Sequence, residues 1–152
     1  MDSSKRQLYE QVILDHNKTP RNFGDMPEAD AKAEGYNALC GDQFTVFLKM
    51  DGDRVAGVKF KGAGCAISKS SASLMTTLLE GKTRAEVEAL FKGFHAMITS
   101  PPGTPIDETA LGKLLVFSGV REYPIRIKCA SLPWHTMLSA LHGNAVEPVS
   151  TE

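Results

Sequence analysis

The sequence lacks both a long hydrophobic run and an excess of charge of one sign. A transmembrane helix needs about 18 or more consecutive apolar residues, and no such run occurs. Seventeen basic residues nearly cancel eighteen acidic ones, so charge gives no reason to expect a nucleic acid or a membrane surface as a partner. The first residues, Met1 to Arg6, do not begin an apolar signal core. We therefore expect a cytoplasmic protein.

Cysteine is also scarce, and its count excludes a closed disulfide framework. Only three occur, Cys40, Cys65 and Cys129, and an odd number of thiols cannot all pair within one chain. In a reducing cytoplasm, grouped cysteines indicate metal binding or catalysis more often than disulfides. Asp42 lies two residues after Cys40, so the chain offers three thiolates and one carboxylate. A tetrahedral metal takes ligands of this number and type.

What the sequence does have is the composition of an ordinary globular domain. Of its 152 residues, 42% are hydrophobic and 23% are charged, which is enough apolar material for a substantial core. No internal repeat or low-complexity tract divides the chain. We therefore predict a single domain over residues 1–152.

Hydrophobic periodicity predicts a β-hairpin among several helices. Strands are expected from Gln43 to Met50 and from Arg54 to Lys61, because apolar and polar side chains alternate on either side of an Asp-Gly-Asp turn. Helical spacing and capping residues predict helices over about 3–17, about 67–80, from the capping box 83–86 to about 94, over 107–117, and most clearly over 134–141. Residues 20–38 are expected to form a long surface loop, and the tail from Gly143 is expected to fray.

Pro133 bears on the position of Cys129. In a regular helix its ring would clash with the carbonyl of Cys129, so we expect Cys129 at a helix start or at a kink. A helix start is the more informative alternative, because a helix N-terminus stabilises a thiolate.

Spacing alone leaves the role of the cysteines open. Three isolated cysteines in a cytosolic protein are more often small buried hydrophobic residues than metal ligands. The basic residues Arg126 and Lys128 flank Cys129, where they would offset the negative charge of a thiolate site or simply form a solvated face. The four histidines are poor ligand candidates, because they lie at helix ends or on an exposed helix face.

Four motifs, in order along the chain, resemble one known family. They are Leu8-Tyr9 through Asp15-His16 with Pro20-Arg21-Asn22, then 37–42, then 62–68 followed by 71–75, and finally 119–121 through 126–130 with 132–134. By these residues the chain is similar to the U-type iron–sulfur cluster assembly proteins, specifically their SufU branch. Ala38 stands where the family usually has a proline. IscU-like members carry a histidine before the last cysteine, where this chain has Lys128. SufU-like members have an insertion before the last cysteine motif, and residues from about 95 to 112 resemble it.

The resemblance implies a fold, a metal and an activity. The implied fold is α+β, a small antiparallel sheet with helices packed on one face, with a short third strand near residues 62–66. The implied metal is zinc, held by Cys40, Asp42, Cys65 and Cys129. The implied activity is a sulfurtransferase that accepts sulfane sulfur from a SufS-type, pyridoxal-phosphate cysteine desulfurase. The sulfur would then pass to downstream SUF proteins that assemble iron–sulfur clusters.

A zinc site with four protein ligands has no open position, so we hypothesise ligand exchange. Cys40 would leave the metal and attack the desulfurase persulfide, since neighbouring Gly41 makes it the most mobile of the three thiols. Arg126 would orient Asp42 or Cys40. Two alternatives stay open. One is a scaffold on which an iron–sulfur cluster is built, and the other is a structural zinc module that only binds a partner.

Overall fold

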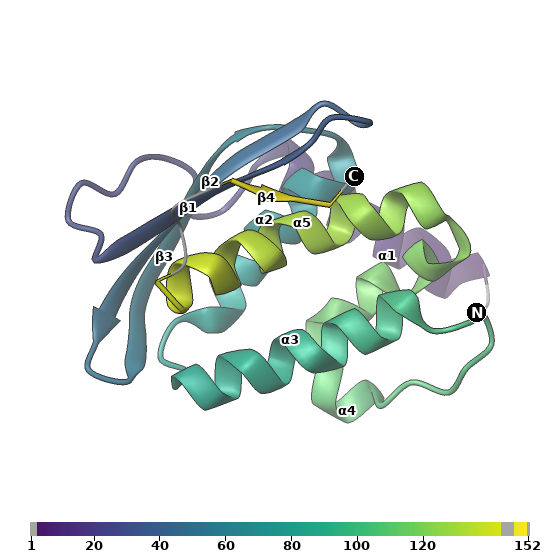
Figure 1. The fold of residues 1–152 in the computed structure, drawn as a ribbon. Helices are drawn as coiled ribbons and strands as arrows, with labels where there is room; N and C mark the ends of the chain where they lie inside the picture. Colours follow the sequence, from purple (N-terminus) through teal and green to yellow (C-terminus); the bar gives the residue numbers. More distant parts are fainter. Residues whose placement is uncertain (1–2, 144–147, 152) are drawn as a thin grey trace.

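The computed structural model describes residues 3–143 and 148–151, with a β-sheet on one side of the molecule and helices on the other (Figure 1). In chain order the elements are α1 (Ser3–Lys18), β1 (Ala31–Asn37), β2 (Asp42–Asp51), β3 (Arg54–Ala63), α2 (Ala66–Leu79), α3 (Arg84–Thr99), α4 (Glu108–Leu111), the 3₁₀ helix η1 (Gly112–Glu122), α5 (Pro124–Leu141) and β4 (Val149–Ser150).

The sheet has the strand order β3-β2-β1-β4. Strands β1, β2 and β3 pair antiparallel, and the two-residue β4 adds a parallel edge beside β1. Helix α5 packs against β1 and β2, while α2 packs against β3 and against α5. Helix α1 covers α2, and α3 covers α5 and η1 (Figure 1). The predicted α+β class, a small sheet with helices on one face, is confirmed.

One hydrophobic core joins the sheet and the helices. Phe44 and Phe60 from the sheet are fully buried in it, as is Trp134 of α5, which stacks on Phe94 of α3 with ring centroids 4.9 Å apart. Large buried side chains thus come from both layers, which supports the proposal that the chain is one domain. No helix in the described part of the chain is long and apolar enough to cross a membrane.

The predicted hairpin and the capping box are present. The Thr83 hydroxyl accepts from the Glu86 amide at 3.2 Å, and the Glu86 carboxylate accepts from the Thr83 amide at 3.0 Å. The helix expected over 107–117 is not continuous, because Gly112 has φ +51° and ends α4 after one turn. The chain then continues as the 3₁₀ helix η1.

The third long strand is β1, not the segment near 62–66, and residues 31–37 are therefore not part of a surface loop. The inward side chains of β1 are Ala33, Gly35 and Asn37, which are small or polar, so the strand carries no hydrophobic alternation. Gly35 is required by packing, because an added Cβ would lie 2.0 Å from Thr136 Oγ1 of α5.

Pro133 lies inside α5 and does not mark its start. The helix continues from Pro124 to Leu141 with Pro133 buried. A proline removes the helical donor to the carbonyl four residues before it, here that of Cys129. The neighbouring Ala130 carbonyl accepts from Ser71 Oγ of α2 at 2.7 Å, so α2 packs against this turn. Cys129 is therefore in the second turn of α5, and the expected dipole stabilisation at a helix start does not apply to it.

The end of the chain is paired with the sheet where the structure describes it. In β4, Val149 is opposite Gly35 and Ser150 is opposite Tyr36. Thr151 Oγ1 donates to the Lys128 carbonyl at 3.1 Å, so this segment also contacts α5. The prediction of a frayed tail is wrong for 149–151, and 144–147 lie outside the described residues.

Candidate metal centre

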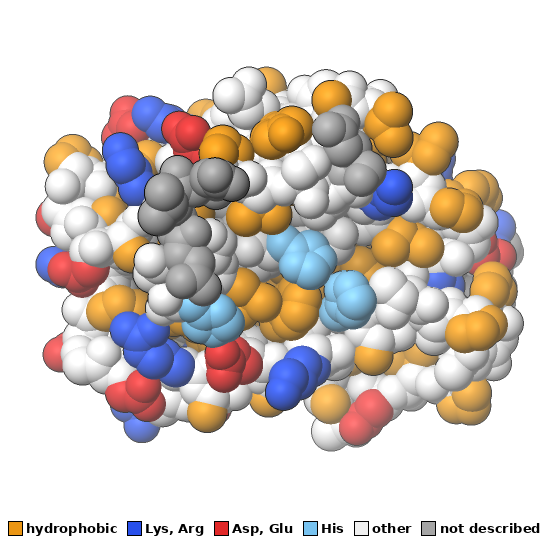
Figure 2. Space-filling model, in the orientation of Figure 1, with side chains coloured by type: hydrophobic (Ala, Val, Ile, Leu, Met, Phe, Trp, Pro, Cys, Tyr) orange, Lys and Arg blue, Asp and Glu red, His pale blue; other side chains and the backbone are white. Residues whose placement is uncertain are grey.

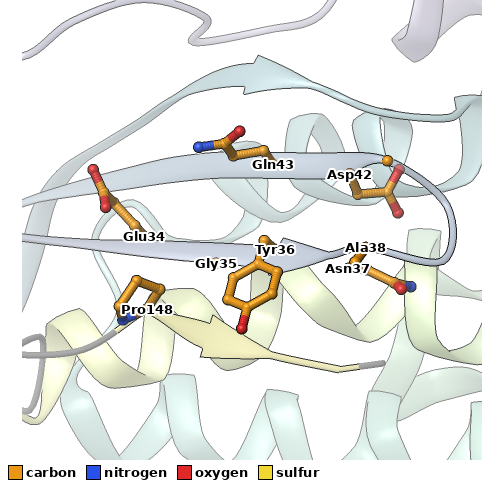
Figure 3. Close-up of a pocket in the computed structure, with 9 residues that line it drawn as sticks. Glu34, Gly35, Tyr36, Asn37, Ala38, Asp42, Gln43 and Pro148 are labelled. Atoms are coloured by element: carbon orange, nitrogen blue, oxygen red, sulfur yellow. The ribbon is translucent and has the colours of Figure 1, made fainter.

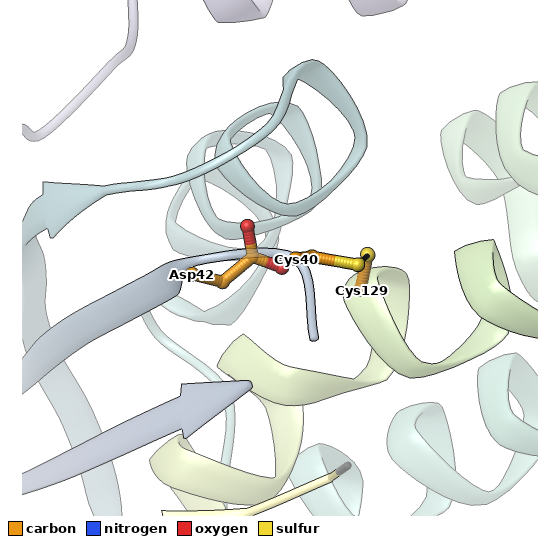
Figure 4. A group of neighbouring side chains, drawn as sticks. All are labelled: Cys40, Asp42 and Cys129. Carbon is orange, nitrogen blue, oxygen red and sulfur yellow. Dashed lines mark hydrogen bonds between the residues drawn. The ribbon is translucent and has the colours of Figure 1, made fainter. Parts of the chain in front are cut away.

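Two segments far apart in sequence, residues 40–42 and the helix that carries Cys129, meet at one end of the sheet. Cys40 lies in the β1–β2 loop, Asp42 begins β2, and Cys129 comes from α5. One possible ligand atom from each of these side chains lies within 4.8 Å of the others (Figure 4). Such a group, formed from two thiols and a carboxylate, suits a divalent cation that accepts sulfur and oxygen ligands.

The two thiols of this group are in contact. Cys129 Sγ donates to Cys40 Sγ across 3.1 Å, and Figure 4 shows the two sulfurs facing each other. Cys129 is 2% exposed, whereas Cys40 is half-buried. Burial raises the pKa of the Cys129 thiol far above its ordinary value, and the Cys40 hydrogen bond and the charges of Cys65 and Asp42 raise it further. A bound cation is the group that would favour the thiolate here.

Asp42 has one carboxylate oxygen in use and one without a partner. Oδ1 accepts from the backbone amide of Cys65 at 2.9 Å. Oδ2 has no hydrogen-bond partner among the described residues, although Asp42 is only 1% exposed. A buried, unpaired carboxylate oxygen is costly, and a metal ion would satisfy it. The donor set therefore fits a metal on an observation independent of sequence motifs.

Cys65 reaches the site through Asp42 and the start of α2. It is the N-cap residue of α2, and its Sγ lies 3.5 Å from the Ser68 amide, which donates to it. The helix-start position that we expected for Cys129 thus belongs to Cys65. Gly64 makes this close approach possible, because an added Cβ would lie 2.7 Å from Asp42 Oδ1.

Asn37 is a site residue that sequence reasoning missed. Its Oδ1 accepts from the Leu39 amide at 3.2 Å, and its carbonyl accepts from the Cys40 amide at 3.2 Å, so it shapes the turn that carries Cys40. Its Nδ2 also points to Cys129 Sγ at 4.0 Å. The available signal was an asparagine three residues before a cysteine at a strand end.

A pocket of about 350 Å³ adjoins the centre (Figure 3). Asn37 and Asp42 line the end of the pocket at the β1–β2 loop, and Pro148 lines it from the segment before β4. Figure 3 shows the remaining labelled residues on β1, on β2 and in the loop between these strands. The pocket thus continues from the candidate metal ligands along β1.

The basic residues and the histidines lie outside the group. The Arg126 guanidinium is 4.5 Å over the Tyr123 ring and, in the described part of the chain, makes no hydrogen bond to Asp42 or Cys40. Figure 2 shows histidine side chains gathered over the contact of α3 with α5, where His95 and His135 pack against Phe91. His16 is buried between α1 and α2 beside the Ser73 hydroxyl at 2.7 Å, and burial lowers its pKa.

The fold and this cluster define a class, an α+β domain with a candidate thiolate–carboxylate metal centre at one end of its sheet. The family model for the NifU-like N terminal domain matches residues 8–130, and the chain belongs to this family.

Relatives of this chain carry two kinds of name. The "Zinc-dependent sulfurtransferase SufU" of Bacillus subtilis is 40% identical over 131 residues, covering 86% of each chain. The "Iron-sulfur cluster assembly scaffold protein IscU" of Thermotoga maritima is 35% identical over 136 residues, covering 90% of this chain and 94% of that protein. The chain is therefore similar to both SufU-like and IscU-like proteins.

Solved structures of the family have the same fold. The crystal structure of FiSufU, from the SUF system of Fervidobacterium islandicum AW-1, has a TM-score of 0.81 at 38% identity, covering 90% of this chain and 98% of that one. The N-terminal part of a NifU-like protein from Brucella abortus has a TM-score of 0.79 at 26% identity, covering 92% of this chain and 96% of that one.

Proposed function

We propose that this protein is a zinc-dependent sulfurtransferase that accepts sulfane sulfur from a SufS-type cysteine desulfurase. It would pass the sulfur to SUF proteins in the cytoplasm, with no nucleic acid or membrane as partner. The proposed zinc ligands are Cys40, Asp42, Cys65 and Cys129. When bound, zinc would supply the positive charge that keeps these thiols deprotonated.

The observation that carries the proposal is the contrast between Cys40 and the other three donors. Asp42 begins a strand, Cys65 caps a helix, and Cys129 lies within a helix. Cys40 belongs to no helix, strand or helix cap and lies in the β1–β2 loop, next to Gly41 at φ +72°. It is half-buried, as is Cys65. Moving Cys40 out of the ligand set therefore disturbs the least secondary structure.

In the proposed reaction, Cys40 Sγ acts as the nucleophile. Its thiolate attacks the outer sulfur of the persulfide on the desulfurase, and a new S–S bond forms on Cys40. The S–S bond within the desulfurase persulfide breaks, and its electron pair leaves with the desulfurase cysteine as a thiolate. Asp42 stays in place through its hydrogen bond to the Cys65 amide.

The surface beside Cys40 suits docking of a large partner. Leu39 is 72% exposed directly before Cys40, and Ile125 is 64% exposed one helical turn before Cys129. Tyr123 is also exposed, two residues before Ile125, and the Arg126 guanidinium lies over its ring. Exposed apolar side chains around a reactive group are typical of an interaction surface. The role of Arg126 in orienting Asp42 or Cys40 stays a prediction.

The scaffold function is a second candidate, favoured by the IscU-like relatives and by a donor set that is equally able to bind iron. The purified protein is first assayed for zinc, iron and acid-labile sulfide. We expect about one zinc per chain without iron. Stoichiometric iron and sulfide would instead assign the scaffold function.

The decisive assay is stimulation of a SufS-type desulfurase by the wild type, Cys40→Ser and Cys129→Ser. We expect Cys40→Ser to abolish both stimulation and persulfide labelling of this chain. Cys129→Ser lowers zinc content but keeps the nucleophile, so labelled Cys40 should persist in it. Full stimulation by Cys40→Ser would exclude Cys40 as the acceptor, and loss of stability without loss of stimulation would indicate a structural zinc module.

A further inference from the structure

We infer that Cys40 and Cys129 are a redox pair, whose oxidation to a disulfide releases the metal while Cys65 stays reduced. This regulation acts on the proposed zinc site and therefore rests on the proposed function. The co-reactant is a peroxide. The inference concerns which two of the three thiols combine.

Geometry selects the pair. The sulfurs of Cys40 and Cys129 are 3.1 Å apart, about 1 Å more than a disulfide bond. Cys65 Sγ is instead placed at the start of α2, with the Ser68 amide and the Ser68 hydroxyl each 3.5 Å away. To form a disulfide with Cys40 or Cys129, Cys65 Sγ would have to lose its hydrogen bond from the Ser68 amide.

Exposure sets the order of events. Cys40 and Cys65 are both half-buried, whereas Cys129 is 2% exposed, so within the pair a peroxide reaches Cys40 before Cys129. The Cys40 thiolate attacks one peroxide oxygen, an S–O bond forms and the O–O bond breaks, giving a sulfenic acid and a hydroxide, which takes a proton from solvent and leaves as water. The Cys129 thiol then attacks the sulfenic sulfur, the S–S bond forms, the S–O bond breaks, and the released hydroxyl takes the Cys129 proton and leaves as a second water. Two thiols are oxidised and one peroxide is reduced.

The disulfide removes two of the four proposed ligands at once. Asp42 and Cys65 stay joined through the hydrogen bond from the Cys65 amide, but two donors are too few for a stable tetrahedral zinc site. The metal therefore leaves when the pair forms, and a thiol reductant restores the site. Cys40 is then also unavailable as the sulfur acceptor.

The test treats the zinc-loaded protein with hydrogen peroxide and needs no desulfurase. Released zinc is followed with a chromophoric chelator, and disulfides are mapped by mass spectrometry after alkylation without reduction. We expect a Cys40–Cys129 link, alkylated Cys65, about one zinc released per link, and recovery after dithiothreitol. A disulfide that includes Cys65, or overoxidised Cys40 without a link, would overturn the inference.

Two variants keep this test independent of folding and of the proposed function. Cys65→Ser should form the same link, because serine is a good N-cap residue and α2 keeps its start. Cys129→Ser should form no intramolecular link, and its Cys40 should proceed to sulfinic acid. If the wild type carried no zinc, the sulfurtransferase proposal would fail, yet disulfide mapping of the metal-free chain would still decide which thiols pair.

Discussion

The two halves of α5 contact different surroundings. The first half, up to Cys129, carries the exposed Ile125, follows the exposed N-cap residue Tyr123, and contributes a thiol to the candidate metal centre. The second half buries Leu132, Trp134 and Met137 in the hydrophobic core. The first half thus serves a polar site that contains an unpaired carboxylate oxygen, while the second supplies apolar contact area. Fold stability and metal chemistry are therefore separable along a single helix.

The largest expected effect on stability comes from truncating a buried side chain in the second half of α5. Trp134→Ala removes the largest fully buried side chain and its stacking on Phe94, so the free energy of unfolding should fall by about 3–5 kcal/mol. Urea titrations should show this loss with and without zinc. Trp134→Phe is the matched control and should lose less, because the indole Nε1 has no partner among the described residues. A loss that occurs only in the zinc-loaded protein would contradict the separation.

Two glycines offer a paired comparison of intermediate size. Gly35→Ala would place its Cβ 2.0 Å from Thr136 Oγ1 in the packing of β1 on α5, and should cost roughly 1–3 kcal/mol of stability. Gly64→Ala would place its Cβ 2.7 Å from Asp42 Oδ1. Because Asp42 is displaced, we expect zinc affinity to fall by at least roughly 10-fold.

Competition with a chelator measures the affinity of each glycine variant, and thermal unfolding measures its stability. Gly35→Ala is the control for Gly64→Ala, since both add one methyl group to a crowded position. If Gly35→Ala reduced zinc affinity as much as Gly64→Ala, the core-packed and site-facing halves of α5 would be coupled.

The smallest expected effect is that of Asp42→Asn on stability, and its sign depends on whether zinc is bound. Asp42→Asn keeps an acceptor for the Cys65 amide and removes a buried charge whose Oδ2 has no described partner. The metal-free variant should gain about 1 kcal/mol of stability. With zinc, the same substitution weakens a ligand and should reduce stability below that of the wild type. Chemical denaturation of both forms checks this, and a loss in both would show that Asp42 is structural.

The parts of the fold that could be predicted from sequence are those with large buried side chains. The hairpin of β2 and β3 was predicted because Phe44, Val46, Leu48 and Phe60 alternate with polar residues. Strand β1 was missed because Ala33 and Gly35 face α5, and small residues there give no hydrophobic signal. The continuation of α5 through Pro133 was missed because proline usually ends or kinks a helix, and the tertiary packing that buries Pro133 is not visible in the sequence.

For the candidate site too, some features could be predicted from sequence and others could not. The four proposed ligands were available from the motifs, and the structure brings Cys40, Asp42 and Cys129 within 4.8 Å. Their role as zinc ligands stays a prediction. The position of Cys129 in its helix and the involvement of Asn37 depend on tertiary packing. Periodicity along a chain carries no information about such contacts.

Short segments cover both edges of the sheet, and this has a consequence for self-association. On the β3 edge, the Phe60 amide donates to the Asn22 carbonyl at 3.1 Å, and its carbonyl accepts from the Gly24 amide at 2.9 Å. On the β1 edge, β4 occupies the positions opposite Gly35 and Tyr36. Bare strand edges are where chains aggregate. At Phe60, and opposite Gly35 and Tyr36, the sheet edges are therefore paired within the chain, and these positions offer no free strand to a second copy.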